Sequence, residues 1–328
     1  MKATLARLGF ALLIFALSIP ASKLILAAND TAVYDGPRFP HQAFRQLPMT
    51  DLSIGGGTLH VAFAPGEWQM SRQALLAWVS QHAGAVAKFY GKLPDGNARL
   101  LILPGDGSGV ASGSTWGQNG AASRITVGRF ADPGRLARDW ILPHELVHHA
   151  LPALDDAHHW LEEGVATYVE PIARAQAGEL RVNKVWLDLV EGLPQGLPQA
   201  GDRGLDRTPT WGRTYWGGAL YCLRADVEIR RRTNNRFGLQ DSLRGIVAAG
   251  ANIGQWWPIE KVLAVGDRAT HTHVMTELYD AMKYTAVDVN LTELWQQLGV
   301  IQRGNDVIFD DTAPLAHIRR AITAARLD

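Results

Sequence analysis

Hydrophobic and polar positions in the first half of the chain alternate with two different periods. The segments TLHVAFA, residues 58–64, and RLLILP, residues 99–104, are typical of strands, the first by alternation and the second by its continuous apolar run. Between them, residues 71–93 have apolar side chains at helical spacing and begin with a serine that is suited to capping a helix. SRITVG, residues 123–128, predicts a further strand, which we expect at the edge of the sheet. The glycine-rich segment 105–113 is predicted to be a loop.

Two helices are predicted next, separated by a break. The first is expected from about Pro133 to Ala150, with a bend or a restart at Pro143. Pro152 then disfavours helical backbone at the residue before it. A second apolar-periodic run extends from about residue 157 to 170, just before Pro171. These runs predict two neighbouring helices with a short connection.

The second half of the chain is predicted to be mostly helical. Proline and glycine cluster in residues 191–204, which we interpret as a loop between two lobes. Helices are expected at about residues 212–232, 239–249, 258–265, 272–284, 291–298 and 315–325, with a short strand at 306–311. The pattern predicts an α+β fold: an N-terminal lobe over 29–190 with a small mixed sheet, then a mostly helical C-terminal lobe over 191–328.

Composition excludes some classes of function. The chain has 328 residues, 47% hydrophobic content and a formal net charge of zero, so it can bury a substantial core and has no bias toward nucleic acid. Its single cysteine, Cys222, cannot form an intrachain disulfide, and we interpret it as a small buried residue. Stability must therefore come from the core and from any bound metal.

The N-terminal segment 1–28 has the features of a secretory signal. Lys2 and Arg7 precede an apolar run over residues 8–21, which predicts export to the periplasm or the medium. No clear cleavage site follows, and residues 8–28 are just long enough to span a bilayer. The alternative is therefore a retained membrane anchor, and we expect membrane contact only through this segment.

The motif with the most specific chemistry is HELVHH, residues 144–149. It contains the pattern H-E-x-x-H, in which His144 and His148 lie on one side of a helix and can bind one metal ion. Glu145 lies beside them, where its carboxylate can act as general base toward a metal-activated water. The motif predicts a zinc site that catalyses hydrolysis.

A catalytic zinc site usually has a third protein ligand, and several side chains compete for this position. An arrangement with a third histidine six residues after His148 is excluded, because position 154 is leucine. We interpret His149, His158 and His159 as surface groups or as groups that orient a ligand. The acidic candidates, together with two of these histidines, are Asp155, Asp156, His158, His159, Glu162, Glu163 and Glu170.

The segment WLEEGVATYVE, residues 160–170, resembles the second zinc helix of the gluzincin metallopeptidases. The aminopeptidase branch of that family reads W-L-x-E-G-x-A, and the resemblance places the ligand glutamate on Glu163. The connection between the two helices is several residues shorter here than in the aminopeptidase N-like and thermolysin-like branches. The resemblance implies one zinc ion, held by His144, His148 and Glu163.

A second segment, residues 214–246, resembles the Y-x-x-G-a-L stretch of the glycyl aminopeptidase family of gluzincins. Its first tyrosine is Tyr215, and the resemblance implies that this residue stabilises the oxyanion. Taken alone, the segment predicts an amphipathic helix with an arginine-rich end.

The resemblance as a whole implies a zincin-like fold and zinc-dependent hydrolysis of peptide or protein substrates, with the active site in a cleft that the C-terminal lobe completes. The G-x-M-E-N strand of the aminopeptidase N-like branch, which binds a substrate amine, corresponds here to residues 113–128, which contain no acidic residue. The alternative hypothesis is a catalytically inactive, zinc-retaining binding or scaffold protein of the same fold. An intact Glu145 argues against it, because a purely structural site needs no base.

Overall fold

The computed structural model describes residues 39–325 of the chain. The predicted signal or anchor, residues 1–28, lies outside the described residues. Within 39–325, no helix combines the length and the apolar character that crossing a bilayer requires.

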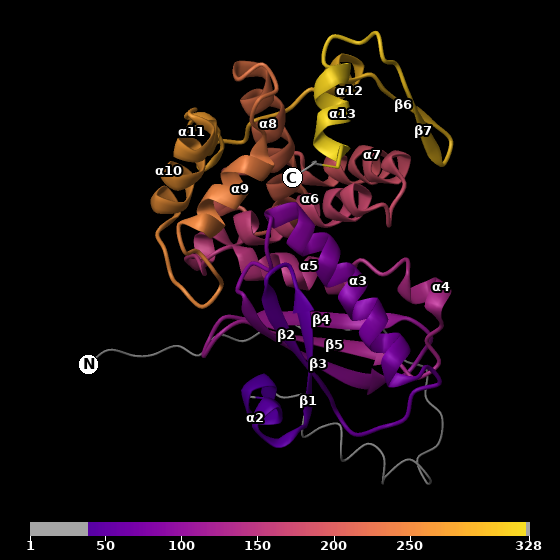
Figure 1. The fold of residues 1–328 in the computed structure, drawn as a ribbon. Helices are drawn as coiled ribbons and strands as arrows, with labels where there is room; N and C mark the ends of the chain where they lie inside the picture. The colour runs from indigo at the N-terminus through magenta and orange to yellow at the C-terminus, as the bar shows by residue number, and fades with distance from the viewer. Residues whose placement is uncertain (1–38, 326–328) are drawn as a thin grey trace, which may run out of the picture.

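A mixed five-stranded sheet forms the N-terminal part of the described chain (Figure 1). Its strands lie in the order β1-β2-β3-β5-β4, with β2, β3 and β5 parallel and the two outer strands antiparallel to their neighbours. The strands are β1 (Met49–Ile54), β2 (Gly57–Phe63), β3 (Asn97–Gly105), β4 (Val110–Trp116) and β5 (Ala122–Gly128). The prediction that residues 123–128 form the edge was wrong: β4, which begins inside the predicted glycine-rich loop, pairs with β5 and takes that position.

Alternate side chains of the central strands point to opposite sides of the sheet, and helices cover both sides, so these strands are buried on both faces. Leu59 and Val61 pack in the main core with the helix α3 (Arg72–Tyr90). Ala62 lies in a smaller cluster with Phe44 of α2 (Phe39–Gln46), on the opposite face. As predicted, the serine before α3 caps it: the Ser71 hydroxyl accepts a hydrogen bond from the amide of Ala74.

The predicted first zinc helix is divided into three pieces. These are α4 (Pro133–Leu136), α5 (Ile141–Val147) and a 3₁₀ turn, η1 (His148–Ala150). The Asp139 carboxylate starts α5, because it accepts hydrogen bonds from the amides of Ile141 and Leu142 at 3.0 Å each. Pro143 therefore lies in the first turn of α5, where it neither bends nor breaks the helix.

The second predicted helix is longer than expected. After a 3₁₀ turn, η2 (Asp156–His158), helix α6 runs from His159 to Ala177 and continues through Pro171. Helices α3, α5 and α8 (Gly218–Arg232) all pack against α6, which makes it the central helix of the molecule. Packing on several sides outweighs the one backbone hydrogen bond that Pro171 cannot make.

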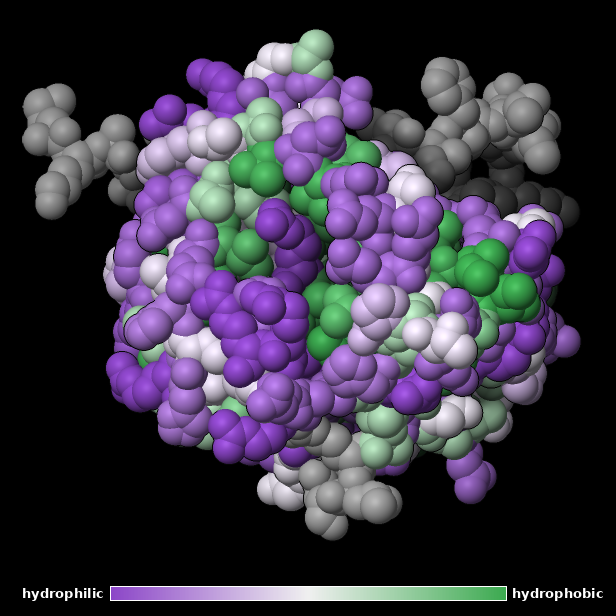
Figure 2. Space-filling view, turned by 90° about the horizontal axis from the view of Figure 1, so that it is seen from above, coloured by the Kyte–Doolittle hydropathy of each residue, from purple (hydrophilic) through white to green (hydrophobic). Residues whose placement is uncertain are grey.

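The remaining elements form the helical C-terminal part, which lies on the other side of α5 and α6 from the sheet (Figure 1). The α+β fold class with a mostly helical C-terminal lobe is thus confirmed. Viewed from this helical side, the surface is largely hydrophilic, with separate hydrophobic patches (Figure 2). The elements are α7 (Val182–Gly192), η3 (Leu193–Gly196), η4 (Leu205–Arg207), η5 (Arg213–Gly217), α9 (Leu239–Ala248), α10 (Ile259–Thr270), α11 (Val274–Met282), α12 (Leu291–Leu298), β6 (Val300–Arg303), β7 (Asp306–Phe309) and α13 (Ala316–Thr323).

Candidate metal centre and active site

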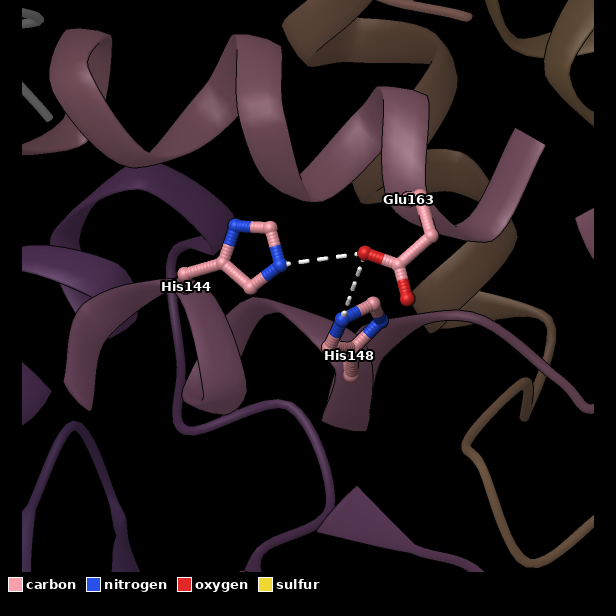
Figure 3. A group of neighbouring side chains, drawn as sticks. All are labelled: His144, His148 and Glu163. Carbon is pink, nitrogen blue, oxygen red and sulfur yellow. Dashed lines mark hydrogen bonds and ion pairs between the residues drawn. The ribbon is translucent and has the colours of Figure 1, made fainter. Parts of the chain in front are cut away.

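His144, His148 and Glu163 converge on one point between α5 and α6 (Figure 3). Each residue offers one ligand atom, and these atoms lie within 4.8 Å of one another. The Nε2 atom of His144 is 3.2 Å from Oε2 of Glu163, and Nε2 of His148 is 3.6 Å from the same oxygen. The predicted donors, which come from α5, the turn η1 that continues it, and α6, are therefore placed where one cation can contact all three.

Other candidate donors make bonds elsewhere. Glu162 accepts a hydrogen bond from the amide of Leu154 at 3.0 Å, and its second oxygen bonds to His159 Nδ1 at 3.0 Å. Glu170 forms an ion pair with Arg174 at 2.7 Å, two turns further along α6. His159 also places Nε2 3.4 Å from Oε1 of Glu163. Of these acidic side chains, Glu163 is the one that lies with His144 and His148, and His159 contacts the oxygen of Glu163 that the other two histidines do not.

The charges within the cluster favour an ionised carboxylate. Burial alone would raise the pKa of Glu163, but His148 and His144 hold that pKa well below its usual range. Burial alone would lower the pKa of His148, but the carboxylate of Glu163 raises it to about 9. A histidine binds a metal as the neutral ring, so a cation bound here would displace the proton from His148.

Glu145 points from α5 toward the edge strand β4 and is not part of the donor group. Its Oε2 atom accepts a 2.6 Å hydrogen bond from the hydroxyl of Thr115. A Cβ atom on Gly113 would lie 2.6 Å from Cγ of Glu145, so the strand can pass this close only because it has glycine there. The carboxylate therefore lies beside the metal donors and is held from the sheet side.

Tyr215 lies in η5, a π-helical turn that leads into α8. Its ring stacks on His144, with centroids 6.4 Å apart, and on the exposed Trp211 at 5.6 Å. Burial raises the pKa of Tyr215, and the carboxylates of Glu163 and Glu145 raise it further. The hydroxyl therefore keeps its proton and can donate it in a hydrogen bond.

The buried pair Arg213 and Asp202 supports this turn. Nε of Arg213 lies 2.8 Å from Oδ2 of Asp202, and its Nη1 donates to the carbonyl of Gly196. π-Helical turns are rare and are often found at functional sites. Sequence reasoning missed both residues, because the contact joins segments whose proximity no local pattern reveals.

Two glycines allow helix α6, which contains Glu163, to lie close to the start of α8, just after the η5 turn that contains Tyr215. A Cβ atom on Gly164 of α6 would lie 2.4 Å from the backbone of Gly218, and one on Gly218 would lie 2.1 Å from the carbonyl oxygen of Trp160. Gly164 directly follows Glu163, and Gly218 lies three residues after Tyr215. The close approach of α6 and α8 therefore sets the distance between the side chains of Glu163 and Tyr215.

We expect Gly164→Ala to lower the free energy of unfolding by about 3 kcal/mol, because the added methyl group meets rigid backbone. Gly84→Ala in α3 is the matched control, since a Cβ there meets nothing within 4 Å. It should stabilise the protein by about 0.5 to 1 kcal/mol through helix propensity. Urea unfolding of both variants measures the difference, and equal stabilities would contradict the described packing.

Comparison with known proteins gives a match in structure only. No family model matches the chain, and no curated protein matches it in sequence. A crystal structure of an aminopeptidase N family protein from Idiomarina loihiensis matches with a TM-score of 0.58 and 14% identity, over 78% of this chain and 50% of that chain. An M1 zinc metallopeptidase from Deinococcus radiodurans matches with a TM-score of 0.48 and 17% identity, over 74% of this chain and 52% of that one.

The first of these matches establishes the fold. The chain has the gluzincin, aminopeptidase N-like fold that the resemblance of its motifs implied. It spans about half the length of the solved structures it matches.

Proposed function

We propose that the protein is a zinc-dependent peptidase in which His144, His148 and Glu163 bind one zinc ion. The observation that supports this most strongly is the convergence of these three donors on one point, with Tyr215 stacked on His144 and Glu145 held by Thr115 from the sheet. Two imidazole nitrogens and one carboxylate oxygen suit zinc, and three protein donors leave a coordination position for water or substrate. The residues therefore fit the metal that the motif implies.

The roles of the side chains follow from their positions. Zinc, when bound, supplies Lewis-acid activation of a water molecule and of the substrate carbonyl. Glu145 takes the proton from the attacking water and returns it to the leaving amine. Tyr215 donates a hydrogen bond to the carbonyl oxygen as negative charge develops there. Together these groups provide nucleophile, base and oxyanion donor for hydrolysis of a peptide bond.

An inactive zinc-retaining scaffold is the less favoured function. Such a protein has no need to hold a carboxylate beside the metal donors, yet Glu145 is 9% exposed and fixed by Thr115.

The hairpin of β4 and β5 contains no acidic side chain, so it offers no carboxylate to a substrate amine. Peptides and proteins remain the proposed substrates, and export remains a proposal that depends on residues 1–28.

Removal of the metal tests this function directly. A chelator should abolish turnover of a mixed peptide library by the full chain, and one equivalent of zinc should restore it, because the water is activated only beside the cation. Mass spectrometry of the products separates internal cleavage from release of single N-terminal residues. Turnover that is unchanged by the chelator would refute the proposal.

A further inference from the structure

We propose that three side chains, His149, Ser123 and Thr115, form a directed hydrogen-bond chain that positions the carboxylate of Glu145 for its work as a base. The inference rests on the proposed function, because it concerns the base of that reaction. The three are positioning residues: they act on the substrate only through Glu145. The sequence motif does not include Ser123 or Thr115, which lie on the sheet.

The hydrogen bonds run without a gap through four side chains, from His149 to Glu145. Nε2 of His149 lies 2.7 Å from Oγ of Ser123, and that oxygen lies 2.9 Å from Oγ1 of Thr115. Thr115 in turn lies 2.6 Å from Oε2 of Glu145. Ser123 and His149 are completely buried, so water does not replace these bonds.

The direction of the chain follows from counting protons. A base begins the reaction as a carboxylate, which only accepts hydrogen bonds, so the single hydroxyl proton of Thr115 goes to Glu145. The carboxylate oxygen at 2.6 Å is a closer and charged acceptor, whereas the main-chain carbonyl oxygen of Glu145 lies at 3.1 Å. Thr115 must then accept from Ser123, and Ser123 must accept from the Nε2–H group of His149. Nδ1 of His149 is buried and has no hydrogen-bond partner among the described residues, which agrees with a proton on Nε2.

As a result, the two carboxylate oxygens of Glu145 differ in their hydrogen bonding. Oε2 is occupied by Thr115 at a distance typical of a charge-assisted bond. A Cβ atom on Gly113 would lie 2.8 Å from Oε1, so glycine at that position leaves space beside this oxygen. Oε1 is therefore the oxygen that is left to take a proton from water.

The same hairpin contains a matched pair of hydroxyl groups for comparison. Thr115 and Ser123 are register partners on β4 and β5, and so are Ser112 and Thr126. The hydroxyl of Ser112 donates to Thr126 at 3.1 Å, on a part of the hairpin that is exposed. Thr126→Val thus removes the same chemical group from the same sheet without touching the chain to Glu145.

Steady-state kinetics of the zinc-loaded full chain test the proposal. Thr115→Val should lower kcat by about 10- to 100-fold, the usual effect of removing a group that orients an active-site residue, with KM changed by less than about twofold. Thr115→Ser, which keeps the hydroxyl, should retain most of the activity, and Thr126→Val should match the wild type. Equal kcat values for Thr115→Val and Thr126→Val, at equal zinc content, would overturn the role.

A second measurement does not depend on activity. In ¹⁵N-histidine NMR spectra, His149 should show the neutral Nε2–H form, with its signals assigned from their loss in His149→Gln, and Ser123→Ala should shift them. An Nδ1–H form would overturn the directed chain even in an active enzyme. Absence of chelator-sensitive turnover in the wild type, with the Nε2–H form present, would instead refute the proposed function and with it the catalytic role of the chain.

Discussion

Glu145→Gln is expected to lower kcat by about 10³-fold, the middle of the range for removing a general base. The amide cannot take a proton from water, but it has the same shape and can still accept the hydrogen bond from Thr115. Since Glu145 is not among the metal donors, zinc content and the free energy of unfolding should stay close to the wild-type values. The measurement is steady-state turnover of a peptide substrate alongside the zinc content of the same sample.

Glu260→Gln is the control, because Glu260 is exposed in the first turn of α10, in the C-terminal helical part. It should leave kcat unchanged. Chelator-sensitive turnover by Glu145→Gln within tenfold of the wild type would show that another group acts as the base.

Tyr215→Phe should lower kcat by about 10²- to 10³-fold, the usual loss when one oxyanion donor is removed. Phenylalanine keeps the ring that stacks on His144 and Trp211, so the site should keep its shape and its zinc. The expected pattern is a loss in kcat without a loss in stability, measured by kinetics and urea unfolding.

Tyr221→Phe provides the opposite pattern in the helix that follows the tyrosine turn. The hydroxyl of Tyr221 is buried and donates to the carbonyl of Met275 at 2.7 Å, away from the metal donors. Its removal should cost about 1 kcal/mol of stability and leave kcat nearly unchanged. If Tyr215→Phe also loses stability and keeps its kcat, Tyr215 is a packing residue.

Local patterns predicted the elements in which apolar residues follow the spacing of a strand or a helix. Strand β2 was predicted from its alternation, β3 from its continuous apolar run, and α3 from apolar side chains at helical spacing. The first four residues of strand β4 fall in the segment 105–113, which was predicted as a loop because it is rich in glycine and serine. Its glycine at position 113 is needed for the approach of Glu145, a constraint that is visible only once α5 lies against the strand.

The predicted helix boundaries were wrong where tertiary packing determines where a helix begins or ends. Pro171 was expected to end the second of the two predicted helices, but α6 is packed against helices on several sides and continues for six residues beyond Pro171 to Ala177. The first helix, expected from about Pro133 to Ala150, was predicted to bend or restart at Pro143, but the restart lies earlier, where Asp139 caps a new helix just before the motif. Neither the cap at Asp139 nor the packing around α6 produces a periodic pattern in the sequence, so these helix ends could not be predicted from it.

In the candidate site, too, some residues could be predicted from local spacing and others could not. The spacing of His144, Glu145 and His148 on one helix is a local signal, so these residues were predicted from the sequence. Glu163 and Tyr215 came from resemblance, and the glycines in the two motifs, Gly164 and Gly218, are the residues whose backbones meet. The hydroxyl groups beside Glu145 could not be predicted, because they depend on the register of two strands.

The central claim is that one zinc ion is held by His144, His148 and Glu163, and its most direct test is the zinc content of the purified full chain. Neighbouring glutamates give a matched pair, since Glu163 meets the histidines whereas Glu162 bonds to Leu154 and His159. After demetallation, reloading and dialysis, elemental analysis should find one zinc per chain in the wild type and in Glu162→Gln, and little in Glu163→Gln. No stoichiometric zinc in the wild type, or equal zinc in both variants, would contradict the account.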